Sequence, residues 1–167
     1  MSNSNYTNPI KEDYSNLKTF VINLDDYKEN YLKQLPYLES IGLKVERFSG
    51  INALKDEHLK PEYKQYISNF AFNFTPKSVI GCALSHILCC KYIFNNYINT
   101  DNNNNNNSSY GDKTQFFLIM EDDTFPKYDK TDFFKRLNKT IYEISLLDSG
   151  WEIIQLHSDA FYPTNET

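Results

Sequence analysis

Short apolar runs alternate along this chain with stretches in which apolar residues recur every three to four positions. The runs at residues 19–24 and 116–120 have the length and the β-branched and aromatic content of strands. A further run of the same kind lies at residues 151–156. The more polar segment at residues 44–48 also has the look of a strand. The pattern therefore predicts four strands, and the run at 116–120 is expected to be a central buried one because no polar residue interrupts it.

Helical spacing fills the intervals between the predicted strands. It predicts a helix over residues 27–41 that is kinked or restarted at Pro36, because proline has no backbone N–H to donate. A longer helix is predicted over residues 78–96 and another over residues 133–144. Residues 54–67 are expected to be helical in pieces.

The order of these elements predicts an α/β fold with a Rossmann-like, mostly parallel sheet. Ligands of such sheets bind beyond the carboxyl ends of the strands. We divide the chain into a polar, flexible N-terminus, residues 1–16, and a single domain, residues 17–167. Within the domain, residues 99–114 are rich in asparagine and are predicted to form a disordered loop.

Composition narrows the classes of function. The chain has 167 residues and a net charge of −5, which argues against nucleic-acid binding. No apolar run reaches the roughly 18 residues of a membrane span, and the N-terminus does not resemble a signal peptide, so we expect a cytoplasmic protein. The cysteines, Cys82, Cys89 and Cys90, are expected to be buried free thiols.

Three consecutive carboxylates, Glu121, Asp122 and Asp123, follow the predicted central strand. Such groups repel one another unless a cation or hydrogen-bond donors offset their charge. Alternation along an extended chain would bring Glu121 and Asp123 together and turn Asp122 away. Two carboxylates and a diphosphate would suit Mn²⁺ or Mg²⁺. A solvated acidic turn is the alternative interpretation.

Two further polar segments are candidates for a binding site. The loop of residues 25–28 follows the first predicted strand, and Lys28 is its cation; an ordinary connecting loop would look similar. Ser85 and His86 lie inside the predicted helix 78–96 among leucines and isoleucines. We expect His86 to be mostly buried, with its ring near the pocket rather than on a metal; a hydrogen-bonded core histidine is the alternative.

Five segments taken together resemble a known family. They are residues 20–25, 47–53, 80–86, 117–123 and 151–156. In this order they are similar to the blocks of glycosyltransferase family 25, which includes lipooligosaccharide and collagen galactosyltransferases. The Gly-Cys-Ala-Leu-Ser-His block at 81–86 and the Glu-Asp-Asp block at 121–123 are the most diagnostic.

The resemblance implies an A-type glycosyltransferase fold and an inverting transfer of galactose or glucose from a UDP-sugar to a glycan or hydroxylysine hydroxyl. It implies Mn²⁺ or Mg²⁺ as cofactor, with Glu121 and Asp123 as the metal-binding residues. The implied donor-binding residues are Asn23, Asp25, Lys28, Asn52, Ser85, His86 and Asp122.

The chain departs from the family pattern in ways that keep other interpretations open. Asp26 and Asn30 stand where the family usually has arginines, and Asn52 stands where it usually has aspartate. The chain also ends at Thr167, earlier than a complete transferase, so we expect the acceptor site and the general base in a missing C-terminal part. The alternatives are an inactive or fragmentary family member that still binds nucleotide, and an unrelated α/β interaction domain.

Overall fold

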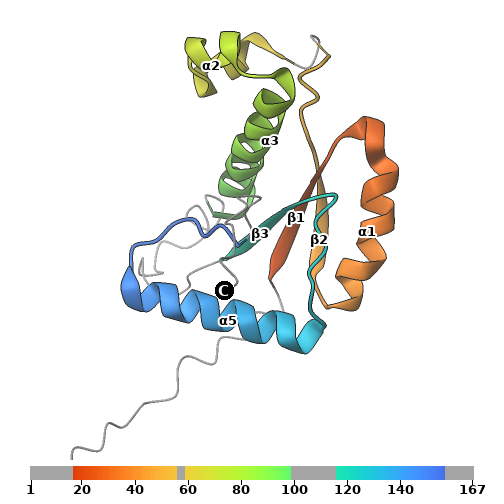
Figure 1. Ribbon diagram of the computed structural model, residues 1–167, viewed down its shortest axis with the longest axis vertical. Helices are drawn as coiled ribbons and strands as arrows, with labels where there is room; N and C mark the ends of the chain where they lie inside the picture. Colours follow the sequence, from red (N-terminus) through yellow and green to blue (C-terminus); the bar gives the residue numbers. More distant parts are fainter. Residues whose placement is uncertain (1–16, 56–58, 99–115, 157–167) are drawn as a thin grey trace, which may run out of the picture.

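The computed structural model describes residues 17–55, 59–98 and 116–156, and a parallel sheet lies at its centre (Figure 1). The strands are β1 (Lys18–Asn23), β2 (Lys44–Ser49) and β3 (Phe117–Glu121), in the order β2-β1-β3. Both pairings are parallel, so the three strands end at the same edge. The predicted α/β fold class is confirmed, and three of the predicted strands lie within a residue or two of their expected positions.

Three main helices surround the sheet. They are α1 (Lys28–Ser40), α3 (Lys77–Ile93) and α5 (Lys130–Leu147). The shorter elements are η2 (Asp25–Tyr27), η4 (Pro61–Tyr66), α2 (Asn69–Phe74) and η5 (Phe94–Ile98). Helix α1 continues through Pro36 as one element, and Gly42, just after its end, has a φ of 86°, a conformation that glycine adopts without steric cost.

The two faces of the sheet are covered by different helices, and the alternation along β1 explains why. Phe20 and Ile22 point to one face, where they pack against Cys89 and Ile93 of α3. Val21 points to the opposite face, where α1 and α5 supply the apolar partners. Burial of such side chains contributes about 1.5–3 kcal/mol each, so the sheet is anchored between the two helical layers.

The predicted strand at residues 151–156 is wrong: this segment carries no regular secondary structure. Trp151 stacks on Phe116 with ring centroids 5.4 Å apart, while the side chain of Ile153 is 84% exposed. An apolar run becomes a strand only when a partner strand satisfies its backbone, and the described residues supply none here. The predictions for residues 1–16 and 99–114 lie outside the described residues.

The cysteines are free, but only one is buried. Cys89 lies in the core, whereas Cys82 and Cys90 are exposed, so the expectation of three buried thiols is wrong for two of them.

The segment Lys77–Ile98 has the length and hydropathy of a membrane-spanning helix, a weak indication because core helices share these properties. Here it packs against the sheet through its buried face.

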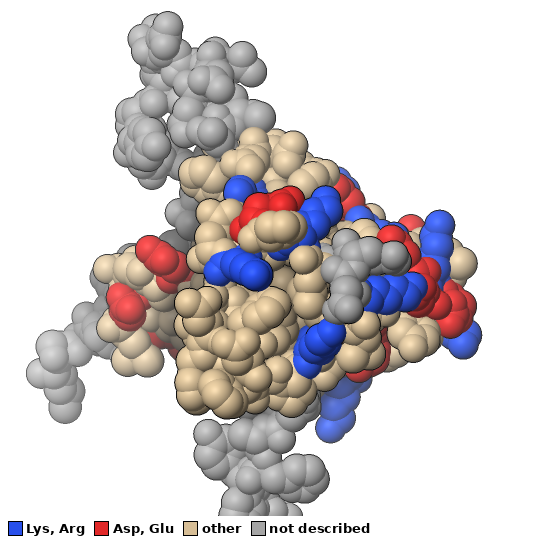
Figure 2. Space-filling model, turned by 90° about the horizontal axis from the view of Figure 1, so that it is seen from above, with Lys and Arg blue, Asp and Glu red and all other residues tan. Residues whose placement is uncertain are grey.

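Charges of both signs are mixed on the surface. Figure 2 shows Lys and Arg side chains lying among Asp and Glu side chains on the face seen from above, with an uncharged area beside them.

Candidate active site

A pocket of about 200 Å³ opens at the carboxyl ends of β1 and β3. Its apolar lining consists of Ile22, Leu24, Ile51, Ala53 and Leu54. Its polar lining consists of Asn52, Ser78, Cys82, Ser85, His86, Glu121 and Asp122. A mixed lining of this kind suits a small polar ligand with an apolar or flat portion.

The topology explains why the pocket lies there. The chain leaves β1 through α1 on one face to reach β2, and it then returns through α3 on the other face to β3, on the far side of β1. The order of the strands therefore reverses between β1 and β3, and this reversal is the switch point where open parallel sheets bind their ligands.

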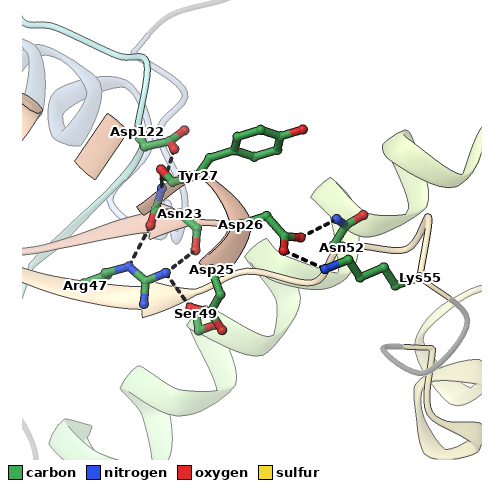
Figure 3. Close-up of polar contacts among 9 residues, drawn as sticks. All are labelled: Asn23, Asp25, Asp26, Tyr27, Arg47, Ser49, Asn52, Lys55 and Asp122. Carbon is green, nitrogen blue, oxygen red and sulfur yellow. Dashed lines mark hydrogen bonds and ion pairs between the residues drawn. The ribbon is translucent and has the colours of Figure 1, made fainter. Parts of the chain in front are cut away.

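Asn23, the last residue of β1, ties together the loops at this edge (Figure 3). It is 1% exposed, and its Nδ2 donates to the backbone oxygen of Tyr27 at 2.8 Å and to Oδ2 of Asp122 at 2.5 Å. Its Oδ1 accepts from Nε of Arg47 at 2.7 Å. The predicted donor-binding Asn23 thus lies behind the pocket and positions Asp122.

An ion pair holds the start of the next turn. Nη2 of Arg47 lies 2.5 Å from Oδ1 of Asp25, and Oγ of Ser49 donates to Oδ2 of the same carboxylate at 2.8 Å. The hydrogen bonds from Arg47 and Ser49 hold the pKa of Asp25 below its ordinary value. Asp25 therefore contacts β2 and is not among the pocket-lining residues.

The neighbouring carboxylate fixes the loop after β2. Asp26 accepts from Nδ2 of Asn52 at 2.9 Å and from Nζ of Lys55 at 2.6 Å, as drawn in Figure 3. These contacts place Asn52 at the pocket wall. Lys28, at the start of α1, is exposed and is not among the pocket-lining residues.

Helix α3 approaches the same loop closely. Oγ of Ser85 accepts from the backbone N–H of Ile51 at 2.8 Å and donates to the carbonyl of Gly81 at 2.7 Å. A Cβ at Gly81 would lie 2.5 Å from the carbonyl oxygen of Ile51, so only glycine permits this approach. Ser85 therefore positions the pocket wall that it also lines.

The acidic turn has an orientation that the sequence did not predict. The strand ends at Glu121, and the N–H of Thr124 donates to the Glu121 carbonyl at 3.1 Å, which closes a turn. Extended alternation consequently stops at Glu121. Glu121 and Asp122 both line the pocket, whereas Asp123 is not among the lining residues, so the structure brings Glu121 to the pocket with Asp122 rather than with Asp123.

Glu121 meets two side chains of α3. Its Oε1 lies 3.0 Å from Nε2 of His86 and 3.5 Å from Sγ of Cys82. Burial and then the charge of Glu121 raise the pKa of the Cys82 thiol. The side chains of His86 and Glu121 are 41% and 47% exposed, so His86 is half-buried and more exposed than expected, and it lines the pocket.

Helical periodicity gives the reason for this exposure. The core-facing stripe of α3 runs through Leu84 and Cys89. Ser78, Cys82 and His86 lie four residues apart on the adjacent stripe, and all three line the pocket. Leucines flank His86 in sequence, but they do not share its face of the helix.

The structure gathers most of the predicted site residues. The predicted residues that line the pocket are Asn52, Ser85, His86, Glu121 and Asp122. Arg47 was not predicted as a site residue, although an arginine within a short strand, in a chain with only two arginines, was a usable signal. Gln34 was not predicted either. It is buried in α1, and it donates to the carbonyl of Glu121 at 2.9 Å and fixes the acidic turn; no local pattern distinguishes it from a surface glutamine.

A parallel α/β sheet with a polar pocket at its switch point defines a ligand-binding protein of the Rossmann-like class. The chain belongs to glycosyltransferase family 25, because the protein-family model described as "Glycosyltransferase family 25 (LPS biosynthesis protein)" matches residues 16–164. The resemblance inferred from the five segments is thereby confirmed, and the chain is a glycosyltransferase by family. No curated protein and no solved structure gives a significant match.

Proposed function

We propose that the pocket binds a UDP-sugar and that the protein transfers galactose or glucose from it, with inversion and metal assistance, to a glycan or hydroxylysine hydroxyl. The family description, a protein of lipopolysaccharide biosynthesis, favours a glycan as acceptor. The observation that carries the proposal is the pair of carboxylates, Glu121 and Asp122, in a pocket at the sheet's switch point.

The charges of the pocket support a divalent cation. Among the residues that the structure describes, its lining contains two carboxylates and no Lys or Arg, so an approaching diphosphate would be repelled without a cation. Carboxylate oxygens suit Mn²⁺ and Mg²⁺, and the donor set therefore fits the cofactor that the family resemblance implies. We assign Glu121 and Asp122 as ligands from the pocket wall and retain Asp123, in the same turn, as a further candidate.

When bound, such a cation neutralises charge that develops on the departing nucleotide. The protein's own residues would do the remaining work. The apolar wall formed by Leu24, Ile51 and Ala53 would contact the nucleoside. Asn52 donates one amide hydrogen to Asp26, and its second amide hydrogen would serve the ligand. The buried network around Asn23 holds Oδ2 of Asp122 and so fixes the position of this residue at the pocket wall.

Titration calorimetry of UDP against the folded protein, with and without Mn²⁺, tests this proposal. We expect Mn²⁺ to tighten UDP binding at least about tenfold, which corresponds to about 1.4 kcal/mol. Asp122→Asn should remove most of that gain and Asp123→Asn less, because Asp122 lines the pocket. Glu143→Gln, an exposed carboxylate on α5, is the matched control and should change nothing.

The outcomes separate the components of the proposal. A larger loss in Asp123→Asn would return the principal metal role to that residue. UDP binding that ignores Mn²⁺ would eliminate the metal role, and no UDP binding by folded protein would eliminate the donor site. Activity is then measured as UDP release from UDP-galactose and UDP-glucose in the presence of candidate acceptors. If UDP binds but no acceptor leads to UDP release, the result would favour the alternative that the protein is an inactive member of the family.

A further inference from the structure

We propose that Cys82, His86 and Glu121 form a second kind of metal site, one that binds Zn²⁺ or a similar transition-metal ion through sulfur, nitrogen and oxygen. The candidate ligand atoms all lie within 4.8 Å of one another. This site shares Glu121 with the proposed donor site but does not depend on nucleotide binding.

Two of the three ligand-to-ligand distances are near the edges of a zinc tetrahedron. Zinc bonds of about 2.3 Å to sulfur and about 2.0–2.2 Å to nitrogen and oxygen give ligand-to-ligand edges of roughly 3.4 Å for N···O and roughly 3.6 Å for S···O. The corresponding separations are 3.0 Å from His86 to Glu121 and 3.5 Å from Cys82 to Glu121. Expansion of the His86–Glu121 contact by a few tenths of an ångström would admit the ion.

The fold holds the three ligands in place. Cys82 and His86 are four residues apart on α3 and therefore share one face of the helix. Glu121 is the last residue of β3, and its carbonyl is fixed by Gln34. Close packing at Gly81 fixes α3 against the loop after β2. Two of the ligands thus come from one rigid helix and the third from a strand end.

The ligand chemistry distinguishes this site from the proposed Mn²⁺ site. Thiolate and imidazole favour zinc, whereas Mn²⁺ and Mg²⁺ favour oxygen ligands. The partial exposure of His86 and Glu121 leaves access for a fourth ligand, and zinc sites with three protein ligands keep that position for water or substrate. Because both sites use Glu121, zinc at this site would compete with Mn²⁺ for the donor pocket.

Zinc titration of untagged protein against a chromophoric chelator, with no nucleotide present, tests the proposal. We expect one zinc ion per chain at this site, and its affinity should fall by roughly a hundredfold or more in Cys82→Ser and in His86→Gln, since even outer-shell changes cost 10–100-fold. Cys90→Ser, another exposed cysteine of the same helix, is the matched control and should bind zinc as the wild type does.

Circular dichroism would reveal whether the variants fold, and if they do not, a second measurement on the wild-type protein tests the proposal. Co²⁺ added to the wild-type protein should produce the near-ultraviolet thiolate-to-cobalt absorption band. Equal zinc affinity in the wild type and a folded Cys82→Ser variant, or a cobalt complex without that band, would overturn the proposal. Neither result bears on UDP binding, which is measured separately.

Discussion

The substitution Gly81→Ala should have two opposing effects on the stability of the folded protein. Gly81 lies inside α3, and alanine is favoured over glycine in a helix interior by about 0.8–1.0 kcal/mol. Helix propensity alone therefore predicts that the substitution stabilises the protein. The packing predicts the opposite, because the new Cβ would lie 2.5 Å from the carbonyl oxygen of Ile51 and 3.2 Å from Cβ of Ala53.

The size of the clash decides between the two effects. Ordinary contact begins at 3.4 Å, so α3 and the loop must separate by about 0.9 Å, and the neighbouring atom is backbone that cannot rotate away. Overpacking of this kind costs about 1–3 kcal/mol, and a rigid backbone neighbour places Gly81 in the upper half of this range, at about 2–3 kcal/mol. The separation would also stretch the 2.8 Å hydrogen bond from Ile51 to Ser85. We expect a net loss of about 1–2 kcal/mol after the propensity gain.

Thermal unfolding of the variant and the wild type measures the outcome. The expected loss lowers Tm by about 2–8 °C for a chain of this size. Gly150→Ala is the matched control, since its Cβ would meet only Asp148 Oδ1 at 3.4 Å, and its Tm should stay near that of the wild type. An unchanged or raised Tm for Gly81→Ala would refute the close approach of α3 to the loop.

Three further predictions follow from the contacts of the site. The pKa of Asp25 is lowered mainly by Arg47. Their pairing therefore stabilises the fold fully above the ordinary aspartate pKa of about 3.9, and this stabilisation is lost as pH falls through the lower pKa of the folded state. Because the pair is partly exposed, Asp25→Asn should lower the free energy of unfolding in urea by at most about 1 kcal/mol at pH 7 and by less at pH 2. Burial raises the pKa of Cys89 to about 12, so mass spectrometry after iodoacetamide treatment at pH 8 should find it unmodified until the protein unfolds; rapid labelling in the folded state would contradict its burial. Ser85→Ala leaves the N–H of Ile51 without its acceptor and should lower stability by about 1–3 kcal/mol in urea unfolding; wild-type stability would show that this bond contributes little.

The hydrophobic pattern was sufficient to predict the elements that build the sheet. β1 and β3 lie in apolar runs of strand length, and β2, although more polar, lies between Gly42 and Gly50, so length and boundaries identified the three strands. The parallel arrangement followed from their alternation with helices. The position of the site followed as well, because ligands of such sheets bind at the carboxyl edge, and the pocket lies there.

Features that depend on distant partners were not predictable in the same way. Residues 151–156 have strand-like composition but no strand partner among the described residues. The direction of Asp122 depends on a turn after Glu121 and on its hydrogen bond to Asn23, 99 positions away. The meeting of Cys82 with Glu121 likewise joins a helix and a strand 39 positions apart.

Hydrogen–deuterium exchange with and without UDP and Mn²⁺ tests the central claim most directly, because it locates the nucleotide on the described residues. Saturating ligand should slow exchange at residues 22–25, 51–54 and 120–124, which contain the pocket wall and the acidic turn, while the C-terminal half of α5 should be unaffected. Protection confined to other segments, or no protection of these three by saturating ligand, would contradict the assignment of this pocket as the donor site.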